Sequence, residues 1–239
     1  MLAGGKGVRM KSHIPKVLHP LCGKSLIEHV VDNLNIAGID DILVVVGYKG
    51  DEVIDRLGSR VNYVWQYEQL GTGHAVMQAE EYFKNYNGDI IVACGDVPLI
   101  KPETFKNLIS LADNEKNGAA VLTMIQDNPT GYGRIVKENK RFVRIVEEKD
   151  ANDEVRKIKE VNSGTYIFKS KYLFEGLKRI NTENAQGEYY LPDVLNYILS
   201  VGLNVEILQL INSIEGSGIN TKEELISLEQ YVAMKEGLN

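Results

Sequence analysis

Short apolar runs rich in β-branched residues alternate along the first half of the chain with longer stretches in which apolar residues recur every three or four positions. This alternation is typical of crossover units that build a mostly parallel sheet flanked by helices. The apolar runs predict strands over 42–47, 61–65, 89–94 and 119–125. The periodic stretches predict helices over 25–37, 49–57, 72–85 and 102–115. We therefore expect the first half of the chain to be α/β.

The pattern changes from about residue 131 onwards. Shorter strands separated by charged segments are predicted at 133–137, 141–148 and 163–168. A helix at 188–200, a strand at 204–211 and a closing helix at 221–236 follow. We expect the same sheet to continue as a mixed, partly antiparallel portion. The sequence contains no internal repeat, and in particular no hexapeptide period of a left-handed β-helix.

Composition excludes several classes of function. The chain has 239 residues, 44% of them hydrophobic, and a net charge of -6 without a long run of lysine or arginine, so a nucleic-acid partner is disfavoured. Cys22 and Cys94 lie far apart and the four histidines show no ligand spacing, so neither a disulfide framework nor a zinc site is indicated. The apolar runs are too short to cross a bilayer, and the sequence shows no charged-then-apolar pattern that would predict a signal peptide. We expect a cytoplasmic protein without a membrane partner.

The first ten residues contain a candidate phosphate-binding loop. The segment 2–10, LAGGKGVRM, gathers three glycines and two cations in one turn: Gly4, Gly5, Gly7, Lys6 and Arg9. Glycines allow backbone N–H groups to converge on phosphate oxygens, and an arginine adds a forked, charge-assisted contact. The alternative is an ordinary flexible N-terminus. Only Met1, Leu2 and Ala3 precede the loop, so the strand that normally leads into such a loop is either truncated or omitted by this numbering.

Three further positions have the chemistry of a nucleotide site. Lys16 lies between two prolines that hold the chain extended, which favours a phosphate ligand over a solvated lysine. Gln66 or Gln69, before the turn at 71–73, could match the donor and acceptor edge of a pyrimidine, although Thr72 there could simply cap a helix. Asp96 directly follows an apolar strand, where open α/β sheets bind ligands, and a carboxylate suits magnesium. Its alternative is a turn aspartate before a proline.

Four motifs in the second half of the chain are each predicted to be a turn when they are considered separately. They are GYGRI (131–135), EEKD (147–150), NSG (162–164) and GIN (218–220). Gly, Asn and Asp are the residues that turns prefer, and EEKD could also be a solvated charged face.

Together these pieces resemble the pyrophosphorylase (uridylyltransferase) domain of the bacterial N-acetylglucosamine-1-phosphate uridyltransferases, in order and spacing across almost the whole chain. The matching strings are LAGGKGVRM, PKVLH, QLGTGHAV, GDVPLI, PTGYGRIV, EEKDA, EVNSGTYIF, NAQGEYYLPDV and GIN. The resemblance implies a Rossmann-like nucleotide-diphospho-sugar transferase fold. It also implies that UTP and N-acetylglucosamine 1-phosphate react, with Mg²⁺ as cofactor, to give UDP-N-acetylglucosamine and pyrophosphate, as in peptidoglycan and cell-wall biosynthesis.

The resemblance also assigns roles by position. The nucleotide would be lined by Leu2, Ala3, Gly4 and Gly5, and uracil would be recognised by Gln66, Gly71 and Thr72. The ribose and the metal would lie above Cys94, Gly95 and Asp96, and the amino sugar would be held by Gly133, Glu147 and Asn162. Magnesium would be bound by Asp96 and Asn220. Phosphates would be contacted by Arg9 and Lys16, which with Asp96 form the expected catalytic set.

The chain also departs from the family pattern. Gly4 stands where alanine is common and Val8 where threonine is common. No part of the sequence resembles the left-handed β-helix acetyltransferase domain of the family, and we expect that domain to be absent. We expect one pyrophosphorylase domain over 1–239, with a nucleotide-binding half at 1–130, a sugar-binding half at 131–220 and a C-terminal helix at 221–239. We expect no acetyl-CoA activity, and a homo-oligomer is possible, with a trimer only if the missing domain is present. The alternatives are a transferase for another sugar or base, such as glucose-1-phosphate uridylyl- or thymidylyltransferase, and a non-catalytic sugar-nucleotide-binding domain.

Overall fold

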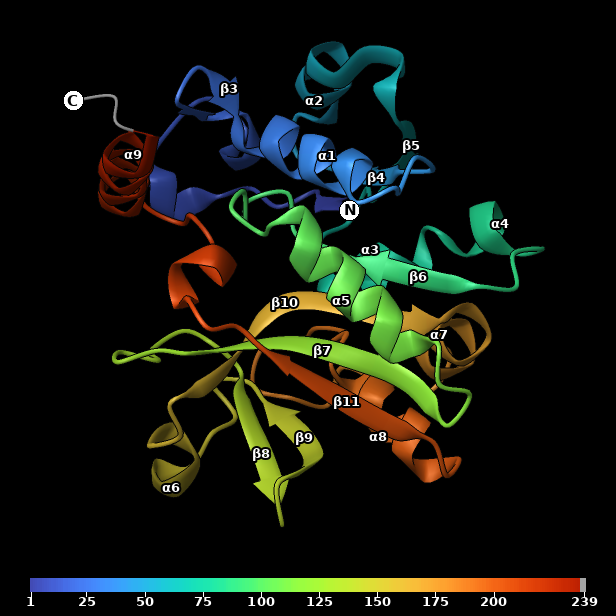
Figure 1. Cartoon of the computed structure of the whole chain (residues 1–239). Helices are drawn as coiled ribbons and strands as arrows, with labels where there is room; N and C mark the ends of the chain where they lie inside the picture. The colour runs from blue at the N-terminus through green and yellow to red at the C-terminus, as the bar shows by residue number, and fades with distance from the viewer. Residues whose placement is uncertain (237–239) are drawn as a thin grey trace.

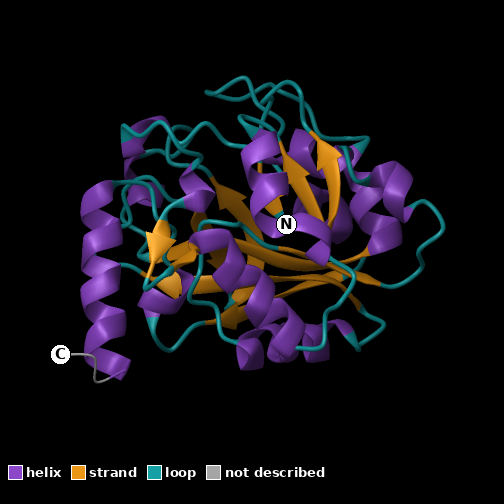
Figure 2. Cartoon of the chain, turned by 90° about the horizontal axis from the view of Figure 1, so that it is seen from above, coloured by secondary structure: helices purple, strands orange, loops and turns teal. Residues whose placement is uncertain are grey.

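Strands form the central layer of the protein and helices cover both faces (Figure 1, Figure 2). The computed structural model describes residues 1–236. The strands are β1 (Leu2–Ala3), β2 (Pro20–Leu21), β3 (Lys24–Ser25), β4 (Leu43–Val46), β5 (Asn62–Trp65), β6 (Asp89–Val92), β7 (Asn117–Ile125), β8 (Arg134–Glu138), β9 (Arg141–Val146), β10 (Glu160–Lys169) and β11 (Asn204–Gln209). The helices are α1 (Leu26–Ile36), α2 (Gly50–Leu57), α3 (Thr72–Met77), α4 (Glu80–Phe83), α5 (Pro102–Ala112), α6 (Asp153–Arg156), α7 (Ser170–Leu177), α8 (Asp193–Ser200) and α9 (Lys222–Glu236).

The sheet is parallel at one end and mixed at the other. Strands β1, β4 and β5 pair in parallel. At the other edge of β1, Leu2 forms a single parallel bridge to Cys94, just beyond the end of β6. Strand β6 in turn pairs antiparallel with β10, which also pairs antiparallel with β7 and β8, and β7 pairs in parallel with β11. The order is therefore β5-β4-β1-β6-β10-β7-β11, with the hairpin of β8 and β9 attached to β10, and the expected α/β fold with a mixed second half is confirmed.

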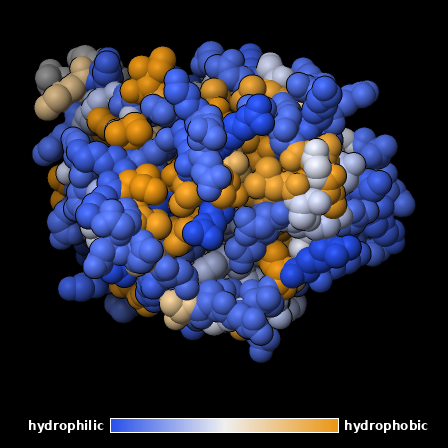
Figure 3. Space-filling model, turned by 90° about the horizontal axis from the view of Figure 1, so that it is seen from below, coloured by the Kyte–Doolittle hydropathy of each residue, from blue (hydrophilic) through white to orange (hydrophobic). Residues whose placement is uncertain are grey.

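The core lies on both faces of this sheet. Along β7 the alternate residues Ala120, Leu122 and Met124 join a cluster that includes α1 and α5, whereas Ala119 and Val121 join a second cluster that includes α7 and α8. A strand buried on both faces needs a continuous apolar run rather than an alternating pattern, which is what the sequence shows there. On the face seen from below in Figure 3, apolar patches interrupt a mostly hydrophilic surface.

Two predicted helices differ from the structure. The helix expected over 72–85 is divided into α3 and α4, and the helix expected over 188–200 begins only at Asp193. Before Asp193, the N–H of Tyr189 donates to Leu70 O and the N–H of Leu191 donates to Thr72 Oγ1. These long-range bonds hold the segment before α8 against the start of α3, and α8 begins only at the end of the turn at 190–193. Within the described residues, no helix has the length and apolar character needed to span a membrane.

Candidate active site

Four of the predicted site residues meet in one cluster. The ammonium of Lys16 contacts the Oδ2 atom of Asp96, and the same nitrogen lies 3.2 Å from the Oδ1 atom of Asn220. Arg9 donates to that amide oxygen over 2.9 Å. Two cations from the first 16 residues therefore face a carboxylate and an amide oxygen from two distant parts of the chain.

Backbone contacts fix the position of Asp96 relative to Asn220. Asp96 follows β6 at the carboxyl end of the strand, and its carbonyl accepts a 3.0 Å hydrogen bond from the N–H of Ile219. The N–H of Asn220 donates to Glu224 Oε2 over 2.6 Å, in the first turn of α9. The amide of Asn220 is thus held between the strand tip and a helix N-terminus.

Lys16 is positioned by the glycine loop. It opens a short 3-10 turn directly after Pro15. Gly7 has a φ of +58°, and a Cβ atom at Gly7 would lie only 2.7 Å from the Cβ atom of Lys16. Only glycine both adopts this backbone conformation readily and leaves room for the lysine. By contrast, a Cβ atom at Gly5 would meet no described atom within 4 Å, so this part of the loop faces open space.

The residues predicted to recognise the base form a second group. The Gln66 side chain is buried, and its Nε2 atom lies 3.1 Å from Gly71 O and 3.1 Å from His74 Nδ1. A Cβ atom at Gly4 would lie 3.0 Å from Gln66 Oε1, so the glycine loop closes over this amide. Thr72 is the first residue of α3, and its hydroxyl accepts from Leu191 instead of capping the helix. The capping alternative for Thr72 is therefore wrong.

The floor between these two groups is built from the ends of β1 and β6. The N–H of Gly95 donates to Leu2 O over 2.9 Å, and Ala3 is buried beneath the glycine loop. The thiol of Cys94 lies 3.5 Å from Gly164 O. Burial, and then the neighbouring Asp96, raise the pKa of Cys94 to about 12. The thiol is therefore protonated near neutral pH and is not a nucleophile.

The residues predicted to hold the amino sugar form a third group in the second half. The N–H of Asn162 donates to Gly133 O over 2.9 Å, and a Cβ atom at Gly133 would lie 3.0 Å from Glu147 Oε1. The Asn162 amide also contacts the hydroxyl of Tyr166 at 2.5 Å. Glu147 opens a turn, because the N–H of Asp150 donates to its carbonyl over 3.0 Å. A fully solvated face does not describe its side chain, because the residue is only partly exposed.

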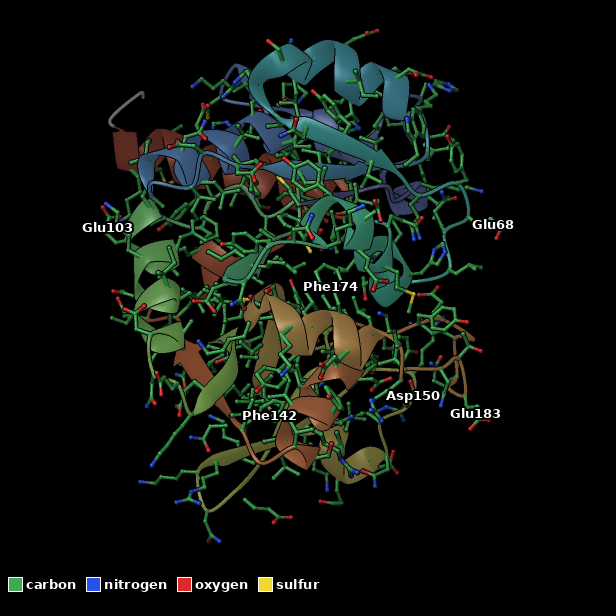
Figure 4. The ribbon with its side chains drawn as sticks, turned by 90° about the vertical axis from the view of Figure 1, so that its right-hand side faces the viewer. Glu68, Glu103, Phe142, Asp150, Phe174 and Glu183 are labelled. Atoms are coloured by element: carbon green, nitrogen blue, oxygen red, sulfur yellow. The ribbon has the colours of Figure 1, made fainter. Side chains whose placement is uncertain are left out.

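Burial, and then the acidic neighbours Asp150 and Asp193, raise the pKa of Glu147 to about 7. Asp150 accepts hydrogen bonds from the Ala185 N–H and the Tyr190 hydroxyl, so the loop around residue 185 lies against it. Figure 4 shows Asp150 and Glu183 close together on one side of the molecule. Glu147 therefore changes its charge near neutral pH, next to the groups expected to hold the sugar.

One side chain, that of Tyr132, connects the residues predicted to hold the amino sugar with the cation cluster, which is formed by Arg9, Lys16, Asp96 and Asn220. Tyr132 precedes Gly133 and forms a hydrogen bond with the backbone of Gly218. Burial, followed by Glu224 and Asp96, raises the pKa of its hydroxyl, and Arg9 acts against this shift. Tyr132 therefore lies between Gly133 of the predicted sugar-binding residues and the residues around Asp96 and Gly218.

The profile of the nucleotidyl transferase family matches residues 1–211. The chain belongs to that family. This nucleotidyl transferase is 46% identical over 240 aligned residues to the bifunctional protein GlmU of Halalkalibacterium halodurans, and 46% identical over 233 residues to that of Geobacillus thermodenitrificans. These alignments cover 100% and 97% of the chain but 52% and 51% of the relatives, so the chain spans about half the length of the curated relatives it matches.

Among solved structures, a UDP-glucose pyrophosphorylase in complex with UDP-glucose has a TM-score of 0.77 to this nucleotidyl transferase. The alignment covers 98% of the chain and 97% of that protein, at 21% sequence identity. At that identity the likeness supports the fold alone.

Several residues in the site were not singled out from the sequence. Tyr132 and Arg134 lie within the GYGRI motif, but nothing in their spacing indicates that the arginine is almost wholly buried. Arg134 pairs with Glu148 at 2.5 Å and donates to the carbonyl of Tyr132, so it holds the turn that presents Gly133. His74 stacks on Tyr189, with ring centroids 6.3 Å apart, behind Gln66.

The donor set of the cation cluster fits a hard divalent ion. Asp96 Oδ2 and the Asn220 side chain converge next to Gly218, where a Cβ atom would lie 3.8 Å from the first and 3.9 Å from Asn220 Nδ2. Their carboxylate and amide oxygens, both in contact with the Lys16 ammonium, are the ligand types that magnesium prefers. Within residues 1–236 no cluster of three or more His, Cys, Asp or Glu side chains forms a self-sufficient metal site. A magnesium ion held by few protein oxygens needs phosphates and water to complete its coordination.

Proposed function

We propose that this nucleotidyl transferase joins UTP to N-acetylglucosamine 1-phosphate and forms UDP-N-acetylglucosamine and pyrophosphate. The observation that carries the proposal is the convergence of Arg9, Lys16, Asp96 and Asn220 at the carboxyl end of β6, beside the glycine loop. The 46% identity to the GlmU proteins over the whole chain supports it. The proposal includes one catalytic unit over 1–239 and a cytoplasmic location, where disulfides are rare.

The reaction requires no covalent intermediate on the protein. A phosphate oxygen of the sugar phosphate attacks the α-phosphorus of UTP, a new P–O bond forms, and the bond to the β-phosphate breaks. Pyrophosphate leaves with that electron pair on the opposite side. Because both reactants are anions, the protein must offset their repulsion and hold the attacking oxygen in line.

The residues of the cation cluster have distinct roles in this proposal. Arg9 and Lys16 contact the phosphates and stabilise the charge that develops on them. Asp96 and Asn220 hold the ammonium in the resting site and are the oxygen ligands for Mg²⁺. The bound Mg²⁺ supplies further positive charge that lowers the repulsion between the phosphates.

The other two groups select the substrates. The amide of Gln66, with Gly71 and Thr72, recognises uracil above the glycine loop. Leu2, Ala3, Gly4, Gly5, Cys94 and Gly95 line the nucleotide. Gly133, Glu147 and Asn162 hold the amino sugar, and a charged Glu147 accepts hydrogen bonds from its hydroxyl or amide groups.

A pyrophosphate-release assay tests this assignment. Four triphosphates (UTP, dTTP, CTP and ATP) are combined with N-acetylglucosamine 1-phosphate, glucosamine 1-phosphate and glucose 1-phosphate, with magnesium and with a chelator. We expect the fastest release with UTP and N-acetylglucosamine 1-phosphate, and loss of release with the chelator. Faster release with glucose 1-phosphate or dTTP would favour a related transferase. No release with any pair would support a non-catalytic binding domain.

A further inference from the structure

A buried acidic side chain joins the two chain segments that carry the proposed magnesium ligands. Glu215 lies in a 3-10 turn over Ser213–Gly216, between β11 and α9 (Figure 1), and is only 7% exposed. Its Oε1 atom accepts a hydrogen bond from the backbone N–H of Lys101 over 3.1 Å and another from the hydroxyl of Thr104. Both partners belong to the start of α5, more than a hundred positions earlier in the chain.

The bonds of Glu215 complete the N-terminus of α5. Lys101 is the N-cap residue of this helix, and its ammonium side chain has no lone pair with which to accept from an N–H group. In a local capping box, an acidic residue three positions after the N-cap accepts from the N–H of the N-cap residue. Thr104 occupies that position here, and Glu215 bonds both to its hydroxyl and to the Lys101 N–H. The helix dipole also favours an acidic group at this end. The helix therefore keeps this cap only while the segment of Glu215 stays against it.

The contact of Glu215 closes one end of a ring of backbone. Lys101 follows Asp96 by five positions, which define the first segment (96–101), and Glu215 precedes Asn220 by five positions, which define the second segment (215–220). The other end of the ring is closed by the N–H of Ile219, which donates to Asp96 O over 3.0 Å. The two segments are thus joined twice, with the proposed magnesium ligands at the end away from Glu215.

Each segment is also attached to a different part of the fold. The amide of Asn33 on α1 donates to Ile100 O over 2.9 Å, which holds the first segment against α1. A Cβ atom at Gly216 would lie 2.6 Å from the Cδ1 atom of Leu210, so the second segment packs closely on the chain just after β11. Because the two segments are attached to different elements, the bonds that join them directly fix the distance between them.

We propose that Glu215 is a positioning residue for the cation cluster. By joining the two segments it sets the separation of the Asp96 and Asn220 side-chain oxygens, and thereby the affinity of the site for a divalent ion. Magnesium demands near-ideal octahedral geometry, so its binding is sensitive to the spacing of its ligands. The carboxyl group of Glu215 is committed to α5 and acts through the backbone. This inference rests on the proposed function, which assigns the metal to Asp96 and Asn220.

The test uses two substitutions of Glu215 and a matched control elsewhere. Glu215→Ala removes the contact with α5, whereas Glu215→Gln retains an oxygen that can accept from Lys101 and Thr104. The control is Glu160→Ala on β10, because Glu160 also accepts from a threonine hydroxyl and a lysine nitrogen, over 2.9 Å and 2.7 Å. Its side chain is 13% exposed, against 8% for Glu215, so the general loss of stability should be similar.

Four quantities are measured on the whole chain. Amide hydrogen exchange at Ile219, relative to the amides of β7, reports the backbone contact with Asp96. Electron paramagnetic resonance gives the affinity for Mn²⁺ in the presence of UTP. Steady-state pyrophosphate release gives the KM for N-acetylglucosamine 1-phosphate, and thermal unfolding gives the melting temperature.

For Glu215→Ala we expect exchange at Ile219 to accelerate and the affinity for Mn²⁺ to fall, each by at least about fivefold. The KM for the sugar phosphate should change by less than about twofold, because the residues predicted to hold the sugar lie in other segments. Glu215→Gln should recover most of both effects. Glu160→Ala should lower the melting temperature without changing the affinity for Mn²⁺ or the relative exchange at Ile219.

Native affinity for Mn²⁺ in Glu215→Ala, or an equal loss of affinity in Glu160→Ala, would overturn the proposal. Should Glu215→Ala not fold, Thr104→Val takes its place, because it removes one of the two bonds to Glu215. Unchanged exchange and affinity in that variant would overturn the proposal as well. If the native protein releases no pyrophosphate with any substrate pair, the proposed function fails, and exchange at Ile219 still decides whether Glu215 fixes the two segments.

Discussion

The raised pKa of Glu147 predicts an unusual effect of a single substitution. Glu147→Gln removes a carboxyl group that must lose its proton among Asp150, Asp193 and Glu188 in a largely enclosed position. Glutamine has nearly the same shape and no charge. We therefore expect this variant to be more stable than the native protein at alkaline pH, even though the residue lies in the proposed sugar site.

The pKa fixes the size of this effect and the pH range in which it occurs. The folded-state pKa of about 7 stands against an ordinary value of 4.5. Between these values the folded state holds more protons than the unfolded state, so the stability that Glu147 contributes when protonated is lost as pH rises through 7. The shift in pKa corresponds to a loss of about 3 kcal/mol in the free energy of unfolding above pH 7. At pH 8.5, Glu147→Gln should therefore raise the free energy of unfolding by about 3 kcal/mol, which corresponds to about 6–12 °C in melting temperature. At pH 4.5 it should change the free energy of unfolding by almost nothing.

The assay is thermal and urea unfolding of both proteins across this pH range, with Glu148→Gln as the neighbouring control. Although burial raises the pKa of Glu148, hydrogen bonds from Arg134 and from the N–H of Gly131 hold it below its ordinary value. Glu148→Gln should therefore lower the free energy of unfolding by about 1–3 kcal/mol near neutral pH, because the buried Arg134 loses its charged partner. If Glu147→Gln changes stability by the same amount at pH 4.5 and 8.5, the reasoning is wrong.

Three further substitutions test the proposed roles. Asp96→Asn should lower kcat by about 10²–10³ with an unchanged circular dichroism spectrum, and a loss under tenfold in steady-state assays would contradict its role. Gln66→Ala should cost about tenfold or less in rate but reduce the preference for UTP over CTP, measured as the ratio of kcat/KM values; an unchanged ratio would contradict base recognition. Gly71→Ala should lower the unfolding free energy by about 1–3 kcal/mol, because φ is +109° and a Cβ atom would lie 2.6 Å from Tyr189 O. Gly5→Ala is its control and should leave melting nearly unchanged, since a Cβ atom there meets nothing within 4 Å.

The sequence predicts much of the fold because buried parallel strands leave a direct signal. The apolar runs located β4, β5, β6 and β7 to within two residues at each end. The late start of α8 left no such signal, because it depends on hydrogen bonds from residues 189 and 191 to Leu70 and Thr72, more than a hundred positions earlier. Hydrophobic periodicity reports which face of a helix is buried and carries no information about such bonds.

The site was less accessible to reasoning from residue types. A glycine loop, a lysine between prolines and an aspartate after an apolar strand each indicated a ligand, but no spacing rule connects Asp96 with Asn220. Only the family resemblance placed them together, and the structure brings both to the Lys16 ammonium. The raised pKa of Glu147 was not predictable in full: the nearby Asp150 contributes to it, but so do enclosure and Asp193, which lies 46 positions away in the numbering of the chain.

The contacts of Asn220 have a consequence for how the protein can be divided. Both Arg9 and Lys16 reach its amide oxygen, and its backbone is anchored by α9. The family match ends at residue 211, which includes every strand of the sheet but not this amide. A fragment cut at that boundary would keep the surfaces for base and sugar, yet its two cations would have no common acceptor. In the proposed reaction, the first and last tenths of the polypeptide would therefore both be needed for the chemistry.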